Sequence, residues 1–105
     1  LIAIVDRNNI QIGGDTEKVM PLGGLADKWR SFGWDAQEID GHDHLAIIQA
    51  IDKAKNSRQP SVIIAHTIPG RGVDFMEYDY HWHGKSPNAD QANQALSQLS
   101  EGSGE

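Results

Sequence analysis

Short apolar runs and longer amphipathic stretches alternate along this chain. Residues 1–5 and 61–67 form the two most apolar runs, and each carries apolar residues on both faces of an extended segment. Such a segment is typical of an interior strand in a parallel sheet that helices cover. Residues 34–39 form a third, shorter candidate strand. The pattern therefore predicts three strands, of which the first and the last are interior.

Amphipathic helices are predicted after each of these strands. The first ends at Gly33, and its apolar face comprises Leu22, Leu25, Ala26 and Trp29. The second begins after Asp43, a good N-cap residue, and ends near Asn56. The third covers residues 88–99, and four of its apolar residues are expected to face inward: Ala92, Ala95, Leu96 and Leu99.

The order strand, helix, strand, helix, strand, loop, helix predicts an α/β fold, a parallel sheet with helices on both faces. At 105 residues the chain is long enough for one small domain only. We expect that domain to span residues 1–99 and residues 100–105 to form a flexible tail. The chain begins at Leu1 within a run of strand formers, as a fragment's edge would.

Composition excludes several classes of function. The formal net charge is −6 and no basic cluster occurs, so the chain lacks the positive surface that nucleic-acid binding requires. Its apolar runs are far shorter than the roughly 20 residues that span a bilayer. It has no cysteine for disulfides or thiolate metal sites, and its first residues do not resemble a secretory signal. We expect a cytoplasmic protein that binds neither nucleic acid nor membrane.

The polar turn after the first strand is the first candidate site. The side-chain oxygen of Asn8 and the backbone carbonyl of Ile10 are hard oxygen donors of the kind that Mg²⁺ or Ca²⁺ takes, commonly together with phosphate oxygens of a ligand. The alternative is that Asn8 and Asn9 only stabilise the turn, because asparagine tolerates left-handed backbone.

Two further segments are candidates. His81 and His83 would share one face if residues 81–84 were extended, which makes a zinc site conceivable, with Asp79 and Glu77 on the same side. A contact of His83 with an anionic ligand, or proton transfer by it, is an alternative, and an ordinary surface histidine is another. The loop of residues 67–72 has the Gly-x-Gly spacing that allows a close backbone approach, although simple loops share it.

Taken together, these segments resemble the second half of the thiamine-diphosphate-binding N-terminal domain of transketolase. The resemblance covers residues 1–99 and rests on four ordered motifs, and its closing motif also resembles the N-terminal subunit of split transketolases. The motifs are LIAIVDRNNIQI at residues 1–12, FGW followed by DGHD at residues 32–43, TI with Gly70 and Gly72, and WHG at residues 82–84.

The resemblance implies a role for individual residues. Asn8 and the Ile10 carbonyl match the positions that hold the metal on the cofactor's diphosphate. His83 matches the histidine that contacts the diphosphate and the sugar substrate, so it is the implied catalytic residue, whereas His81 receives no role. Ile12 and Ile68 match apolar positions near the cofactor.

The implied activity is the transfer of a two-carbon ketol unit from a ketose phosphate to an aldose phosphate, with thiamine diphosphate and Mg²⁺ or Ca²⁺. The implied partners are sugar phosphates, the upstream half of the domain with its aspartate ligand, and a pyrimidine-binding domain or subunit, in a homo- or hetero-oligomer. This chain is expected to be inactive alone.

Gly13 and His66 depart from the family, which commonly has aspartate and lysine there. Two alternatives remain. One is another thiamine enzyme, such as deoxyxylulose-phosphate synthase or a 2-oxo acid dehydrogenase component, and the other is a non-catalytic α/β assembly module.

Overall fold

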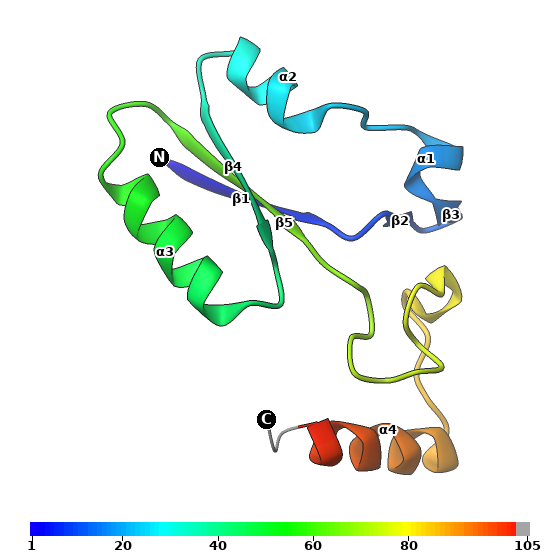
Figure 1. Cartoon of the computed structure of the whole chain (residues 1–105). Helices are drawn as coiled ribbons and strands as arrows, with labels where there is room; N and C mark the ends of the chain where they lie inside the picture. Colours follow the sequence, from blue (N-terminus) through cyan, green and yellow to red (C-terminus); the bar gives the residue numbers. More distant parts are fainter. Residues whose placement is uncertain (103–105) are drawn as a thin grey trace.

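Three parallel strands with one helix on each face form the main body of the molecule (Figure 1). The computed structural model describes residues 1–102. The chain passes through β1 (Ile2–Arg7), α2 (Leu25–Ser31), β4 (Asp35–Asp40), α3 (His44–Lys55) and β5 (Ser61–His66). The strands lie in the order β1-β5-β4, and both pairs are parallel. The predicted α/β fold is confirmed.

Smaller elements interrupt and follow this series. Between β1 and α2 the chain forms the antiparallel strands β2 (Ile10–Gln11) and β3 (Gly14–Asp15), followed by the short helix α1 (Thr16–Val19). After β5 it forms a 3₁₀ helix at Tyr80–Trp82 and the helix α4 (Ala89–Gly102). The sequence pattern did not predict β2, β3 or α1, which are only two to four residues long.

Strand β5 is the centre of the core, as its two-sided apolar pattern predicts. Val62 and Ile64 are fully buried and point to the face that α2 covers, where they pack with Ala26 and Ala36. Ile63 points to the opposite face and packs with alanines of α3. Helices therefore cover both faces of the sheet, as expected.

Strand β1, in contrast, is not an interior strand of this chain. It pairs with β5 on one side only, and its exposure alternates along its length. Ala3 and Val5 pack under α2, whereas Ile2 and Ile4 point to the other face and are 38% and 61% exposed. The prediction failed because α3 packs over β4 and β5 and no described element covers the Ile2 and Ile4 side of β1.

The N-terminus of α3 is capped as predicted. The side chain of Asp43 accepts a hydrogen bond from the backbone N–H of Ala46 at 3.1 Å, and the helix ends at Lys55 with Asn56 as its C-cap. We expect Asp43→Ala to lower the free energy of unfolding by about 1 kcal/mol, because an N–H of the first turn loses its acceptor. Gln49→Ala, an exposed change on the same helix, is the control. Urea unfolding that gives equal values for both variants would contradict the capping role.

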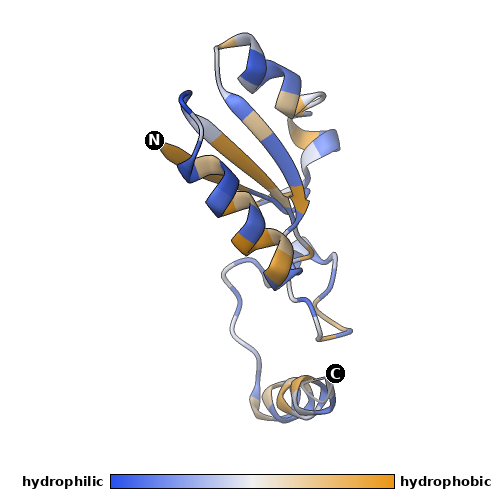
Figure 2. Cartoon of the chain, turned by 60° about the vertical axis from the view of Figure 1, so that its left-hand side comes forward, coloured by the Kyte–Doolittle hydropathy of each residue, from blue (hydrophilic) through white to orange (hydrophobic). Residues whose placement is uncertain are grey.

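Helix α4 lies apart from the sheet (Figures 1 and 2). Leu96 and Leu99, which were expected to face inward, are 63% and 48% exposed, and the contacts of α4 include the loop that follows β5. There the backbone N–H of Asp74 donates to the Gln98 side chain at 2.9 Å. The helix continues to Gly102, through residues that the sequence suggested were tail, and residues 103–105 lie outside the described part.

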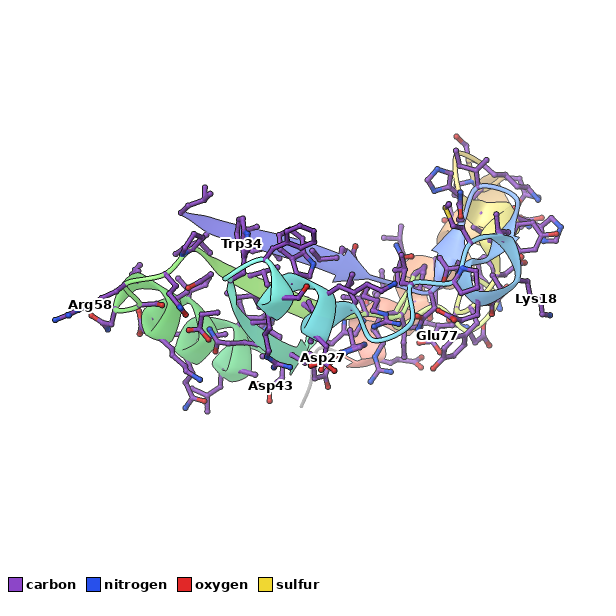
Figure 3. All side chains as sticks on the ribbon, turned by 90° about the horizontal axis from the view of Figure 1, so that it is seen from above. Lys18, Asp27, Trp34, Asp43, Arg58 and Glu77 are labelled. Atoms are coloured by element: carbon purple, nitrogen blue, oxygen red, sulfur yellow. The ribbon has the colours of Figure 1, made fainter. Side chains whose placement is uncertain are left out.

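The molecule is elongated and thin, with principal extents of 49 × 35 × 17 Å. Arg58, at the sheet end, and Lys18, in α1, lie at opposite ends (Figure 3). No helix in residues 1–102 is both long and apolar enough to cross a bilayer. The carboxyl ends of β1 and β5 point toward the end that carries α1 and the 3₁₀ helix, and the candidate site lies there.

Candidate functional site

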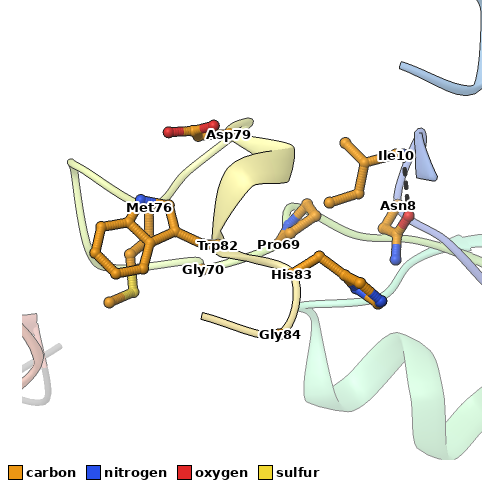
Figure 4. A pocket seen from close by; sticks show the side chains of 9 residues that line it. All are labelled: Asn8, Ile10, Pro69, Gly70, Met76, Asp79, Trp82, His83 and Gly84. Carbon is orange, nitrogen blue, oxygen red and sulfur yellow. Dashed lines mark hydrogen bonds between the residues drawn. The ribbon is translucent and has the colours of Figure 1, made fainter. Parts of the chain in front are cut away.

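A cavity of about 310 Å³ lies where the chain leaves β1 and β5 (Figure 4). In open α/β sheets, ligands bind at this edge, beyond the carboxyl ends of parallel strands. The turn after β1, the loop after β5 and the segment around the 3₁₀ helix all contribute to it. Its lining residues are Asn8, Ile10, Pro69, Gly70, Met76, Asp79, Trp82, His83 and Gly84.

The turn after β1 brings Asn8 and Ile10 to this cavity. The Asn8 side-chain oxygen accepts a hydrogen bond from the Ile10 backbone N–H at 3.1 Å, and Asn9 adopts left-handed backbone with φ of 60°. The Asn9 carbonyl accepts from the Thr16 N–H at 2.9 Å, which ties the turn to α1. The two asparagines thus stabilise the turn, as one sequence interpretation held, and Asn8 also lies in the cavity wall.

His83 enters the cavity from the segment after the 3₁₀ helix. Its backbone N–H donates to the Tyr80 carbonyl at 3.0 Å, and its side chain is exposed. Figure 4 shows its ring on the side of the cavity where Asn8 lies, with Asp79 on the far side. Within residues 1–102 the His83 ring has no hydrogen-bond partner, so both ring nitrogens are open to a ligand.

The His81 side chain, unlike that of His83, is held by contacts within its own segment. Its Nδ1 lies 2.6 Å from Asp79 Oδ1, and its ring stacks on Tyr80 with centroids 4.1 Å apart. Hydrogen bonds from the His81 backbone N–H and ring lower the pKa of the Asp79 carboxyl below its ordinary value. The segment is a 3₁₀ helix and not extended, so the geometric premise of a paired-histidine zinc site is wrong. No group of three histidine, cysteine or carboxylate side chains in the described residues could hold a metal ion.

The loop after β5 reaches the cavity through Pro69 and Gly70. Gly70 has φ of 73°, and a Cβ there would lie 2.6 Å from the Met76 Cβ, so only glycine fits. The Gly-x-Gly spacing therefore marks a required close approach. Ile68 precedes this point and is half-buried without lining the cavity, and Ile12 is 77% exposed on the turn between β2 and β3. The structure does not bring these two isoleucines to the site.

Two lining residues, Trp82 and Met76, received no site role in the sequence analysis. Trp82 donates its indole N–H to the Phe75 carbonyl at 2.9 Å and packs against the Phe75 ring, and the Lys85 ammonium lies 4.5 Å from the centre of the Trp82 ring. Met76 packs against Gly70 on the same side. The sequence did offer a signal, because this segment is dense in aromatic residues. Packing was the default interpretation of those residues, so they did not indicate a site.

The donors at this cavity fit half of a site for a divalent cation and a diphosphate. Asn8 contributes an amide oxygen with a second lone pair beyond the one that Ile10 N–H occupies. Ile10 lines the same cavity and carries a backbone carbonyl oxygen, and His83 contributes an imidazole with open nitrogens. Hard cations take oxygen donors of this kind and complete their shell with phosphate oxygens and water.

Comparisons with known proteins point to one family. The family described as the thiamine diphosphate binding domain of transketolase matches residues 1–102. An apulose-4-phosphate transketolase subunit of Phocaeicola vulgatus is 40% identical over 102 residues, which cover 96% of this chain and 36% of that protein. The 6-deoxy-6-sulfo-D-fructose transketolase subunit SqwG of a Clostridium species is 47% identical over 78 residues, or 73% of this chain and 28% of that protein.

The fold comparison gives the same result. The crystal structure of transketolase from Campylobacter jejuni superposes with a TM-score of 0.86 at 31% identity, over 93% of this chain and 15% of that one. The chain thus spans about a third or less of each of these relatives. The family match extends over nearly its whole length. The chain belongs to the transketolase thiamine diphosphate binding domain family.

Proposed function

We propose that this chain forms part of the thiamine diphosphate site of a transketolase that transfers a two-carbon ketol unit from a ketose phosphate to an aldose phosphate. The observation that carries the proposal is the meeting of Asn8, Ile10 and His83 at one cavity, from segments at opposite ends of the sequence. The relatives named above are transketolases or parts of them, which favours this activity over that of other thiamine enzymes or of an assembly module.

In this proposal the Asn8 side-chain oxygen and the Ile10 carbonyl hold Mg²⁺ or Ca²⁺ against the cofactor's diphosphate. His83 donates a hydrogen bond to the diphosphate and moves a proton at the substrate oxygen next to the reacting carbon. Ile12 and Ile68 are the proposed apolar positions near the cofactor, although neither lines the cavity of this chain. The bound cofactor's thiazolium supplies the carbon chemistry itself.

The proposal requires partners. Asn8 and Ile10 provide two ligands, fewer than Mg²⁺ needs, so an aspartate from the other half of the domain completes the shell. Activation of the cofactor falls to a pyrimidine-binding domain or subunit, and the relatives that are themselves named as transketolase subunits support assembly with a second chain. Sugar phosphates are the substrates, and the cytoplasm is the expected compartment.

Replacing Asn8 tests the metal role. In the assembled enzyme, Asn8→Ala should raise the Mg²⁺ concentration for half-maximal activity by about tenfold or more, because the ion loses one of its oxygen ligands. Asn8→Asp, which keeps an oxygen at the same place, should retain most of the affinity. Asn9→Gly tolerates the left-handed backbone at the next residue and is the matched control. A Mg²⁺ requirement that is equal in Asn8→Ala and the control would refute the metal role.

A further inference from the structure

The DGHD motif at residues 40–43 places a histidine against the loop that enters the cavity. The backbone N–H of Ile68 donates a hydrogen bond to His42 Nε2 at 2.7 Å. A backbone N–H can only donate, so Nε2 must be the unprotonated nitrogen of a neutral ring with its proton on Nδ1. This contact joins residues that the sequence analysis treated separately, the start of α3 and the loop after β5.

The surrounding backbone brings His42 into reach. The His42 N–H donates to the Asp40 side chain at 2.9 Å, and the Gly41 N–H donates to the His66 carbonyl at 2.8 Å. A Cβ at Gly41 would collide with the Thr67 Cγ2 and crowd the His66 carbonyl, so glycine at this position allows the close approach of the β4–α3 connection to the end of β5.

The opposite side of the same loop is held from β1. The Thr67 hydroxyl donates to the Asp6 carboxylate, and the Thr67 N–H donates to the Arg7 carbonyl at 3.3 Å. Because β5 lies between β1 and β4, its outgoing chain is held by both neighbours, Asp6 on one side and His42 on the other. Pro69 and Gly70, which line the cavity, follow at once.

We propose that His42 is a positioning residue for the candidate site, and that its neutral imidazole fixes the loop of residues 68–70 by accepting the Ile68 N–H. The consequence for cofactor binding rests on the proposed function, whereas the hydrogen bond itself does not. Without His42 the half-buried Ile68 N–H has no other acceptor among the described residues, and Pro69 and Gly70 lose their fixed position at the cavity.

Nuclear magnetic resonance of the isotope-labelled full chain tests the contact directly. At about pH 7.5 the wild-type His42 ring should show the Nδ1–H tautomer and a coupling from Nε2 to the Ile68 amide. His42→Leu should speed exchange of the Ile68 amide proton by about tenfold or more, whereas exchange of the Ile64 amide proton, in the preceding strand β5, should not change. His42→Gln, whose carbonyl oxygen can accept, should stay within about threefold of wild type.

His44→Leu is the matched control, because this neighbouring histidine is exposed and its ring has no hydrogen bond within residues 1–102. An Nε2–H tautomer in the wild type, or Ile68 exchange that is equal in His42→Leu and the control, overturns the proposal. If His42→Leu does not fold, the wild-type tautomer and the His42→Gln exchange rate still decide the matter.

Cofactor titration of the assembled enzyme tests the consequence. His42→Leu should raise the thiamine diphosphate concentration for half-saturation by about tenfold while kcat at saturation stays within about threefold. Unchanged half-saturation would overturn the positioning role. A wild-type enzyme that binds no thiamine diphosphate would refute the proposed function instead, and the resonance experiment would still stand.

Discussion

His83→Ala in the assembled enzyme should lower the rate of ketol transfer by about 10²- to 10⁴-fold, the usual contribution of a positioned acid or base. Cofactor affinity should fall much less. The imidazole gives the diphosphate one charge-assisted hydrogen bond, worth about 1–3 kcal/mol, and the metal site compensates for much of it. Steady-state kinetics and cofactor titration on the same preparation separate the two effects.

His44→Ala is a better control for this experiment than His81→Ala. His81 bonds to Asp79, a lining residue, and stacks on Tyr80, so its removal would disturb the cavity wall. His44 lies at the start of α3, outside the residues that line the cavity. If His83→Ala and His44→Ala have equally small effects, His83 is an ordinary surface histidine and its proposed role is wrong.

The isolated chain should bind thiamine diphosphate more weakly than about 1 mM, even with Mg²⁺ present, whereas the assembled enzyme should bind it far more tightly. Asn8 and Ile10 offer the cation two oxygens, and the described residues hold no carboxylate cluster that could supplement them. Calorimetric titration of the chain, with the assembled enzyme as the positive control, measures the difference. Micromolar, Mg²⁺-dependent binding by the chain alone would contradict the half-site.

The parts of the fold that sequence predicts well are those whose partners lie within the chain. Strand β5 has covering helices on both faces and is buried as its pattern requires, and α3 begins at the cap that Asp43 supplies. Strand β1 and helix α4 have equally clear patterns, but Ile4 of β1 and Leu96 of α4 stay exposed in the described part of the chain. Periodicity identifies an apolar face without specifying what covers it.

The candidate site likewise contains residues that the sequence predicts and residues that it does not. Asn8 and His83 were predictable because each belongs to a short motif, and the structure brings both to one cavity. Met76 and Trp82 received no site role, although Trp82 belongs to the WHG motif, because packing explains a methionine or aromatic residue equally well until its neighbours are known. Likewise, the contact of His42 with Ile68 depends on strand order, which places the ends of β4 and β5 side by side.

The one-sided pairing of β1 has a consequence for handling the chain in solution. Within the described residues no strand pairs with its outer edge, which lies beside exposed Ile2 and Ile4, and a strand of this kind is a template on which another chain can add. Proline, lysine and bulges normally blunt such edges, and the β1 sequence IAIVDR contains neither of those residues. Concentrated solutions of the separate chain should therefore tend to form edge-to-edge aggregates, and coexpression with a protein that covers β1 is the natural remedy.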